Sequence, residues 1–465
     1  MELWFRWWDV VLQLRPACGR IRTFLWMSVC LAGMSVRKDL LGVSSIVRAI
    51  GLKEFCYDRI LDFFHTASLD LKKLTQIWTT VIMRCLPLLK TNGRVLLVGD
   101  GLKVPKAGKK MPGVKKLHQE SESNSKPEYI FGHFCQTIAV LGGAKNSVFA
   151  VPLASRIHDG VTSSNRDTRT SLDKMIHLIT ELCIRMPFYF IADAYYAGRK
   201  MAYGLLLQGN HLVTRVRSNA VAYLPPETAK KSGKRGRHAL YGKKVKLKEF
   251  LMSVRAHTIQ SPIYGDKDIK IQFTFADLLW RPIGIPVRFI LAIHPYRGRI
   301  ILMCTDLALP PAEIIKIYGL RFKIEISFKQ SLHVIGAYAY HFWMKISNII
   351  RKNTGNLYLH RKPKEFREAV RRKISAYQAH IQVGVIAHGL IQYLSLCFPK
   401  LVWASFGSWM RTANPNACPS ERVTTVAMRN SFPEFLGVSF KRSILSKFLL
   451  KRIDISRSEG FYMVA

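Results

Sequence analysis

Two short apolar segments that each end in an aspartate constrain the fold of this chain most strongly. They are RVLLVGD, residues 94–100, and FYFIAD, residues 188–193. Such runs are typical of parallel strands covered on both faces, and the helical pattern between them favours an α/β fold. We therefore expect Asp100 and Asp193 at the carboxyl ends of neighbouring strands, the edge at which α/β sheets bind their ligands.

Hydrophobic periodicity divides the rest of the chain around this core. The expected regions are a helical region over residues 1–90, an α/β core over 91–216 and 311–345, a β-rich basic insertion over 217–310, and a mainly helical region over 346–465. Further strands are predicted over residues 129–141, 147–157, 211–216, 269–279, 287–295 and 299–306, and helices over 167–185 and near 364–396.

The segment YGLRFKIEISFKQ, residues 318–330, is predicted to be a helix with an unusual polar stripe. At 100° per residue, Tyr318, Arg321, Glu325 and Lys329 share one face between two apolar flanks. Other polar residues of this segment already form a face toward solvent on the opposite side of the helix. Because buried charge must be paired or bind a metal, we expect this column to point inward and form the wall of a site.

The charge balance indicates a polyanionic partner. Lys and Arg number 71 against 30 Asp and Glu, a net charge of +41, so nucleic acid is the leading candidate. A membrane surface is the alternative, but the longest clean apolar run, residues 24–34, is too short to span a bilayer and is expected to be a buried helix.

Nine cysteines without a C-x-x-C pair indicate a cytoplasmic protein with no zinc site. Signatures of nucleotide hydrolysis and zincin chemistry are absent from the sequence.

Three acids are the candidate catalytic residues and metal ligands: Asp100, Asp193 and Glu325. Neighbouring carboxylates repel unless a cation lies between them, and three of them can hold two Mg²⁺ or Mn²⁺ ions for phosphodiester chemistry. Each also has a structural interpretation, because the aspartates could cap turns and Glu325 could pair with neighbouring cations. Asp306, which ends residues 299–306, is an alternative third ligand.

These residues resemble the DDE transposases of bacterial insertion sequences, in the subgroup with a Tyr-Arg-Glu-Lys signature that is called IS-four. The resemblance covers roughly residues 90–345. Its signature lysine would fall at Leu332, so Lys329 is the expected substitute and His333 the alternative.

The resemblance implies an RNase H-like core with the β-rich insertion before the Glu. It implies that Asp100, Asp193 and Glu325 bind the metals, that Tyr318 and Arg321 contact DNA phosphates, and that the chain cuts element ends and joins the 3′-hydroxyl to target DNA. A homodimer in a synaptic complex is also implied, with residues 1–90 as a candidate end-binding region and 346–465 as a candidate oligomerisation region. A relative that binds DNA without cutting it, and a nuclease without strand transfer, are the alternatives.

Basic residues outside the stripe are the remaining candidate DNA contacts. They are Lys103 and Lys106 after the first aspartate, and Arg215 and Arg217 after the strand at 211–216. Residues 230–248 contain nine Lys and Arg without an acid, and either follow DNA phosphates or are simply solvated. Trp280 could stack on an unpaired base, but a place in the core is expected.

Overall fold

The computed structural model divides the chain into two compact units. It describes residues 1–108, 110–119, 127–144, 147–226, 239–262, 266, 268–345, 355–438 and 443–456. The first unit consists of Met1–Leu88, Gly101–Ile184 and Glu325–Ala465, and the second of Leu89–Asp100 and Arg185–Ile324. The boundary that the sequence pattern places near residue 217 lies inside the second unit.

The second unit is built on a mixed sheet. Its strands are β1 (Lys90–Thr91), β2 (Arg94–Pro105, up to Asp100), β7 (Phe188–Ala192), β8 (His211–Val216), β9 (Val221–Tyr223), β10 (Lys244–Lys246), β11 (His257–Gln260), β12 (Lys270–Trp280), β13 (Ile285–His294) and β14 (Gly298–Cys304). Its helices are η2 (Ala194–Tyr196), α7 (Arg199–Leu206), α8 (Leu247–Met252), α9 (Pro311–Gly319), η3 (Leu320–Phe322) and the start of α10 (Lys323–Gln330).

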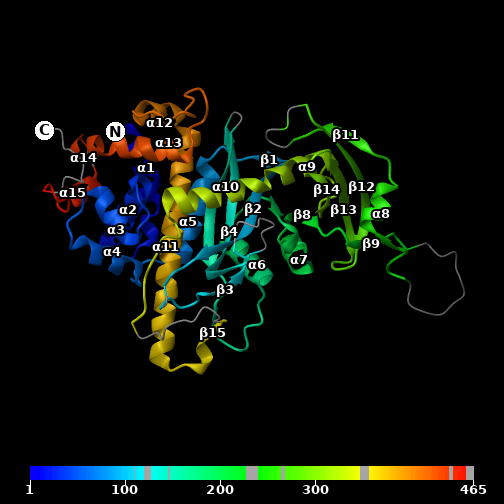
Figure 1. Cartoon of the computed structure of the whole chain (residues 1–465), viewed down its shortest axis with the longest axis horizontal. Helices are drawn as coiled ribbons and strands as arrows, with labels where there is room; N and C mark the ends of the chain where they lie inside the picture. Colours follow the sequence, from blue (N-terminus) through cyan, green and yellow to red (C-terminus); the bar gives the residue numbers. More distant parts are fainter. Residues whose placement is uncertain are drawn as a thin grey trace, which may run out of the picture. The chain divides into compact units, whose positions relative to one another are not determined.

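The strand order in this unit is β10-β9-β12-β13-β14-β8-β7-β2 (Figure 1). Strands β2, β7 and β8 are parallel, and β14 joins β8 in the antiparallel sense. The apolar runs form these strands as expected, and β7 is buried along its whole length. The β-rich residues after 217 therefore extend the sheet that contains β7 and β8.

The first unit contains most of the helices. They are α1 (Glu2–Gln13), η1 (Arg15–Ala17), α2 (Ile21–Val36), α3 (Gly42–Ile50), α4 (Cys56–Phe64), α5 (Leu71–Cys85), α6 (Ser171–Glu181), the rest of α10, the π-helical turn η4 (Ser331–Ile335), η5 (Leu359–Arg361), α11 (Lys364–Cys397), α12 (Pro399–Phe406), α13 (Glu421–Asn430), α14 (Phe432–Val438) and α15 (Ile444–Leu450). Its strands are the end of β2, β3 (Lys115–His118), β4 (Tyr129–Ala144), β5 (Ser147–Ile157), β6 (Val161–Thr162) and β15 (Leu357–Tyr358).

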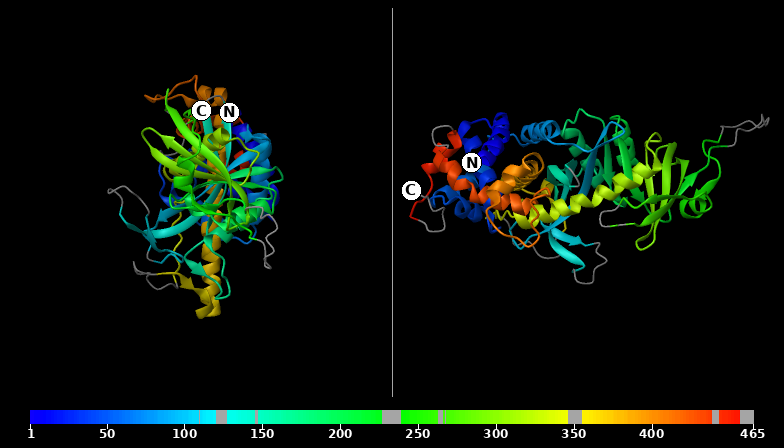
Figure 2. Two further views of the ribbon diagram at one scale, coloured as in Figure 1. Left: turned by 90° about the vertical axis from the view of Figure 1, so that its right-hand side faces the viewer. Right: turned by 90° about the horizontal axis from the view of Figure 1, so that it is seen from above.

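Helix α2 forms the centre of the helical core. Every residue of α2 from Thr23 to Val36 is buried, and α2 packs against α3 and α11. The buried helix expected at residues 24–34 is thus confirmed, and so is the long helix expected near 364–396. Helices from the two ends of the chain, blue and red, lie together in Figures 1 and 2. Within the described residues, no single helix is long and apolar enough to cross a membrane, although the bent pair α11 and α12 meets those conditions jointly.

The helix expected over residues 318–330 is interrupted. Helix α9 ends at Gly319, the 3₁₀ turn η3 follows, and α10 begins at Lys323. A 3₁₀ turn advances about 120° per residue instead of 100°, so three such residues rotate the following helix by about 60°. Glu325 and Lys329 are accordingly exposed, whereas Ser327 is buried. The expectation that the whole column points inward was wrong for these two residues.

The end of this helical segment is fixed by a buried arginine in the first unit. Arg37, 2% exposed, donates hydrogen bonds to the carbonyl oxygens of Ile335 (2.9 Å) and Gly336 (2.8 Å) and to the Ser45 hydroxyl (2.9 Å). Gly336 has φ of 68°, and a Cβ there would meet the Arg37 guanidinium. The guanidinium therefore caps the carbonyl end of η4, where a cation is favoured.

Candidate functional site

Asp100 and Asp193 stand at the same level of two adjacent parallel strands. The register of β2 against β7 pairs Val98 with Ile191, and each aspartate lies two residues further on. Asp193 keeps an extended backbone, with φ of −77° and ψ of −178°. Because residues two apart on a strand face the same side, both carboxylates extend from the same face, on strands about 4.8 Å apart. The expectation that neighbouring strands bring these two acids together is supported by this register.

Strand β2 continues beyond the expected end. It runs five residues past Asp100 to Pro105. The parallel pairing with β7 is formed over Val95–Val98 only. Asp100 thus lies within a strand, just past its paired part, rather than at a strand end.

Two arginines place positive charge beside this pair of acids. Arg321 of η3 lies 3.1 Å from Asp100 Oδ2, and both side chains are about one-fifth exposed, at 20% and 18%. Arg215 follows Thr214, which pairs with Ala192 in the β7–β8 register, so Arg215 stands level with Asp193. Thr214 also donates a 2.6 Å hydrogen bond to the Asp193 carbonyl. An acid–acid–arginine row therefore crosses β2, β7 and β8.

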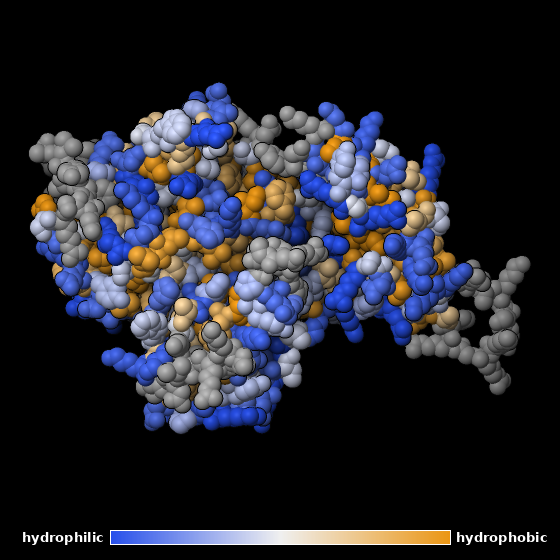
Figure 3. Space-filling model, viewed as in Figure 1, coloured by the Kyte–Doolittle hydropathy of each residue, from blue (hydrophilic) through white to orange (hydrophobic). Residues whose placement is uncertain are grey.

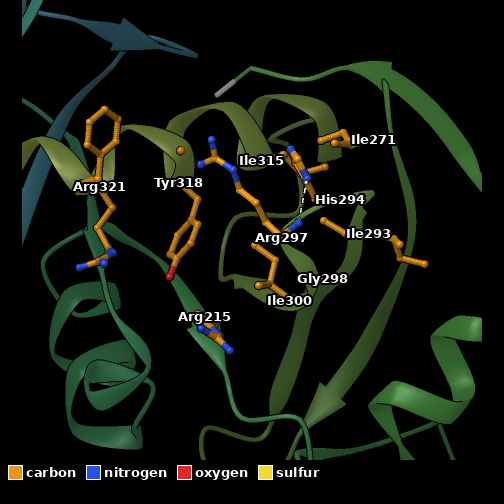
Figure 4. Close-up of a pocket in the computed structure, with 13 residues that line it drawn as sticks. Arg215, Ile271, Ile293, His294, Arg297, Gly298, Ile300, Ile315, Tyr318 and Arg321 are labelled. Carbon is orange, nitrogen blue, oxygen red and sulfur yellow. Dashed lines mark hydrogen bonds between the residues drawn. The ribbon is translucent and has the colours of Figure 1, made fainter. Parts of the chain in front are cut away.

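Tyr318 and these arginines border a cavity of about 380 Å³ in the second unit (Figure 4). Its walls are mainly apolar, from Ile271, Ile293, Ile300, Ile315 and Phe322. Burial raises the pKa of Tyr318, while the positive charges of Arg321 and Arg215 oppose that rise. Tyr318, Arg321 and Arg215 were predicted site residues, and the structure brings all three to one cavity.

A polar cluster that the sequence pattern did not indicate borders the same cavity through His294 and Arg297. Asp266 accepts hydrogen bonds from His294 Nε2 (2.8 Å), Arg297 Nη2 (3.1 Å) and the Ser261 hydroxyl (2.6 Å). The bonds from Ser261 and His294 lower the pKa of Asp266. His294 Nδ1 accepts from the backbone N–H groups of residues 296 and 297, so both ring nitrogens are engaged. The cluster fixes the β13–β14 turn and places Arg297 at the cavity.

Asp306, the alternative third ligand, lies at the end of the strands opposite to that of Asp100 and Asp193. Its strand β14 is antiparallel to β8, so the end of β14 lies beside the beginnings of β7 and β8. The carboxylate accepts a 2.6 Å hydrogen bond from the Tyr189 hydroxyl and a 2.9 Å bond from the Ala308 N–H. These contacts assign Asp306 a structural role.

Glu325 and Lys329 lie on the part of α10 that belongs to the first unit, and both side chains are exposed. Lys103, also in the first unit, is half-buried and donates a 2.6 Å hydrogen bond to the His118 carbonyl. Arg217 is exposed at the end of β8. Hydrophilic side chains cover much of the face shown in Figure 3.

Lys106 is not placed for the predicted contact with DNA. It is 6% exposed, donates hydrogen bonds to the carbonyl oxygens of Tyr338 and Tyr340, and lies 3.7 Å from the centre of the Tyr340 ring. Burial lowers its pKa to about 7.

Trp280 is 7% exposed, as expected of a core residue. Within the basic run 230–248, residues 230–238 lie outside the described residues.

A divalent cation is only partly accommodated by what the structure brings together. The aspartate pair supplies carboxylate oxygens, the ligands that Mg²⁺ and Mn²⁺ prefer. Among the described residues, however, no group of three or more His, Cys, Asp or Glu side chains is placed to hold a metal ion. Asp100 and Asp193 therefore supply two ligands for a divalent cation, which needs further ligands to complete its coordination.

Comparison with known proteins points to one family. A family model for a DDE superfamily endonuclease matches residues 25–264, just over half of the chain. Asp100 and Asp193 lie within the matched residues, whereas Tyr318, Arg321 and Glu325 lie beyond them. No curated protein matches the chain.

Proposed function

Because the chain belongs to the DDE superfamily endonuclease family, we propose that it is a DNA transposase of a bacterial insertion sequence, of the IS-four type. It cuts the ends of its element by phosphodiester hydrolysis and joins the freed 3′-hydroxyl to target DNA. The observation that carries this proposal is the level placement of Asp100 and Asp193 on adjacent parallel strands, with arginines on both sides. The carboxyl edge of parallel strands is where such sheets bind ligands, which supports an RNase H-like core.

We propose Glu325 as the third ligand, with Asp100 and Asp193, for Mg²⁺ or Mn²⁺. When bound, the cations would supply an activated water and stabilise the leaving oxygen of the phosphodiester. Carboxylates from three separate places in the chain provide this chemistry without a Ser, Cys or Tyr nucleophile. Water and the 3′-hydroxyl then act as successive nucleophiles at one site.

The cationic residues of the second unit bind and orient the DNA strand. A guanidinium presents a fork of N–H donors that matches a phosphate, so Arg321 exchanges its contact with Asp100 for a phosphate oxygen. Arg215 holds a neighbouring phosphate from its place beside Asp193. Tyr318 stays protonated, since burial raises its pKa, and its hydroxyl donates to the same strand. Lys329 takes the place of the signature lysine.

A DNA-binding relative that does not cut is the second candidate. It is favoured by the lack, among the described residues, of a three-acid group placed for a metal, and by Leu332 at the signature lysine position. A homodimer holding two element ends, end recognition by residues 1–90 and oligomerisation through 346–465 belong to the transposase proposal. The nuclease alternative, in which the protein cuts DNA without joining it, does not include these features.

One experiment separates the three functions. The protein is incubated with DNA carrying the inverted repeats that flank its gene, with and without Mg²⁺, and breaks and joined products are mapped. A transposase gives Mg²⁺-dependent breaks at the repeat ends and strand-transfer products. Breaks without joining identify a nuclease, and binding without breaks identifies the non-cutting relative.

A further inference from the structure

The first unit contains a second, separate hollow that none of the predicted site residues line. It has a volume of about 550 Å³ and lies among the start of α5, the end of β5, helix α6 and helix α11. We call it the basic pocket, defined by its five cationic residues: Lys72, Arg156, Arg169, Lys174 and Arg371. Three acids, Asp159, Asp167 and Glu181, also line it.

Each of these three acids already has a cationic partner. Asp159 pairs with Lys115, which is outside the pocket lining. Asp167 accepts two hydrogen bonds from the Arg169 guanidinium, at 2.9 and 2.8 Å, and a third from the Arg169 backbone N–H at 3.1 Å. Glu181 lies 3.5 Å from the buried Arg156 guanidinium.

The three other cations of the pocket form no such close ion pair. Within the described part of the chain, no carboxylate lies within 4.0 Å of Lys72, Lys174 or Arg371. Lys72 and Arg371 are exposed, and Lys174 donates a hydrogen bond to the His158 carbonyl. The pocket therefore carries an excess of positive charge at its open side.

His158 also lines the pocket, and its pKa responds to the same excess of positive charge. Its Nδ1 lies 2.6 Å from the Gln136 side-chain oxygen. Burial, then the charges of Lys174 and Arg156, lower its pKa to about 3, so the ring stays neutral among cations. Like charges gathered from α5, β5, α6 and α11 repel one another, a cost that a bound anion removes.

The lining suits a phosphate group in particular. Besides the cations, Ser163, Ser375 and Gln378 line the pocket and offer hydroxyl and amide donors. Backbone phosphates of nucleic acids are bound by this mixture of Lys, Arg, Ser and Gln side chains. We propose that the basic pocket binds a backbone phosphate of a DNA strand, as a contact additional to the carboxylate site. The inference rests on DNA being the partner, as proposed above.

The test measures how DNA binding responds to salt. Binding of a labelled duplex is followed by fluorescence anisotropy in EDTA, so that no strand is cut. The variant Lys72→Gln/Arg371→Gln removes two exposed cations of the pocket. The matched control, Lys400→Gln/Arg411→Gln, removes two exposed cations of the same unit that do not line it. Thermal melting of all proteins confirms that they are folded.

The pocket variant is expected to bind at least about tenfold more weakly, and its slope of log K against log salt is expected to fall by about 2. The control should keep the slope of the unaltered protein. An unchanged slope in the pocket variant, or an equal fall in the control, overturns the proposal. If the unaltered protein does not bind DNA at all, the proposed function itself fails.

Inorganic phosphate distinguishes a DNA contact from a site for a free ion. It is titrated against the unaltered protein and the pocket variant by calorimetry. Weak binding that the pocket variant loses, together with its lower DNA slope, supports the proposal. Phosphate binding that is lost while the DNA slope is kept overturns it in favour of a free anion.

Discussion

Arg321 donates a 3.1 Å hydrogen bond to the carboxylate of Asp100, joining η3 to β2 through two partly buried side chains. On the next strand Asp193 stands level with Asp100, and on the strand after that Arg215 stands level with Asp193. Adjacent carboxylates are thus balanced by cations before any metal is bound. The same cations are positioned to receive a phosphate.

Replacing Arg321 tests whether this contact serves catalysis. We expect Arg321→Ala to lower DNA cleavage about 100-fold, the usual scale for losing a charge that stabilises a transition state. The free energy of unfolding should fall by no more than about 1 kcal/mol, since the pair is partly exposed. Gel assays of nicking and chemical denaturation measure the two effects.

Arg288 provides the matched control for Arg321. It forms two 2.8 Å hydrogen bonds to Asp277 in the same unit, away from the aspartate pair. Arg288→Ala should lower stability while cleavage stays unchanged. Equal cleavage losses in the two variants would show that Arg321 only forms a structural ion pair and has no role in catalysis.

Asp100→Asn and Asp193→Asn are each expected to lower cleavage at least about 100-fold, because an amide cannot replace a carboxylate toward a divalent cation. DNA binding should persist, since the cationic contacts remain. Asp306→Asn is the control, because that carboxyl also follows an apolar strand but binds Tyr189 at the opposite edge. Normal cleavage by either of the first two variants would remove that aspartate from the site.

Arg37→Gln is expected to destabilise the first unit by about 3 kcal/mol. The substitution leaves the buried carbonyl groups of Ile335 and Gly336 without their donor, and each such loss costs about 1–3 kcal/mol. The neighbouring Lys38 is exposed, so Lys38→Gln should have no measurable effect. Denaturant midpoints followed by circular dichroism compare the two, and equal midpoints would contradict the role of Arg37 as a cap.

The stability of the protein should fall in acid partly through His133. Burial lowers the pKa of this ring to about 3, whereas in an unfolded chain it is about 6.5. The unfolded state therefore takes up a proton first as the pH falls. The contribution of His133 is complete above about pH 6.5 and is lost by about 1.4 kcal/mol per unit between there and about pH 3.

The variant His133→Gln should flatten the pH dependence of unfolding by that slope. His118→Gln, at an exposed position, should leave it unaltered. Thermal denaturation across this pH range provides the measurement. A slope unaffected by His133→Gln would show that the ring does not remain neutral in the folded state.

The sequence predicted the strands well because their apolar runs are long and end in polar residues. It indicated that Asp100 and Asp193 would be neighbours, but not their register, which depends on β2 lying beside β7. The inward column of residues 318–330 was predicted correctly only as far as Arg321. The 3₁₀ turn at residues 320–322 rotates the helix that follows, and a uniform helical periodicity contains no sign of it.

The burial of Lys106 shows a second limit of sequence patterns. Its ammonium group is satisfied by carbonyl groups more than 230 residues away in the chain, and a lysine in a basic loop looks the same whether or not such acceptors exist. Asp266, His294 and Arg297 were missed for the same reason. Their cluster depends on the folding of β13 and β14, and none of the three belongs to a recognisable local motif.

Binding of Mn²⁺ tests most directly whether Asp100, Asp193 and Glu325 act as one metal centre. Calorimetric titration of the unaltered protein should show binding that Asp100→Asn, Asp193→Asn and Glu325→Gln each weaken at least about tenfold, while Asp306→Asn leaves it unchanged. A Glu325→Gln protein that binds Mn²⁺ as tightly as the unaltered protein would contradict the account.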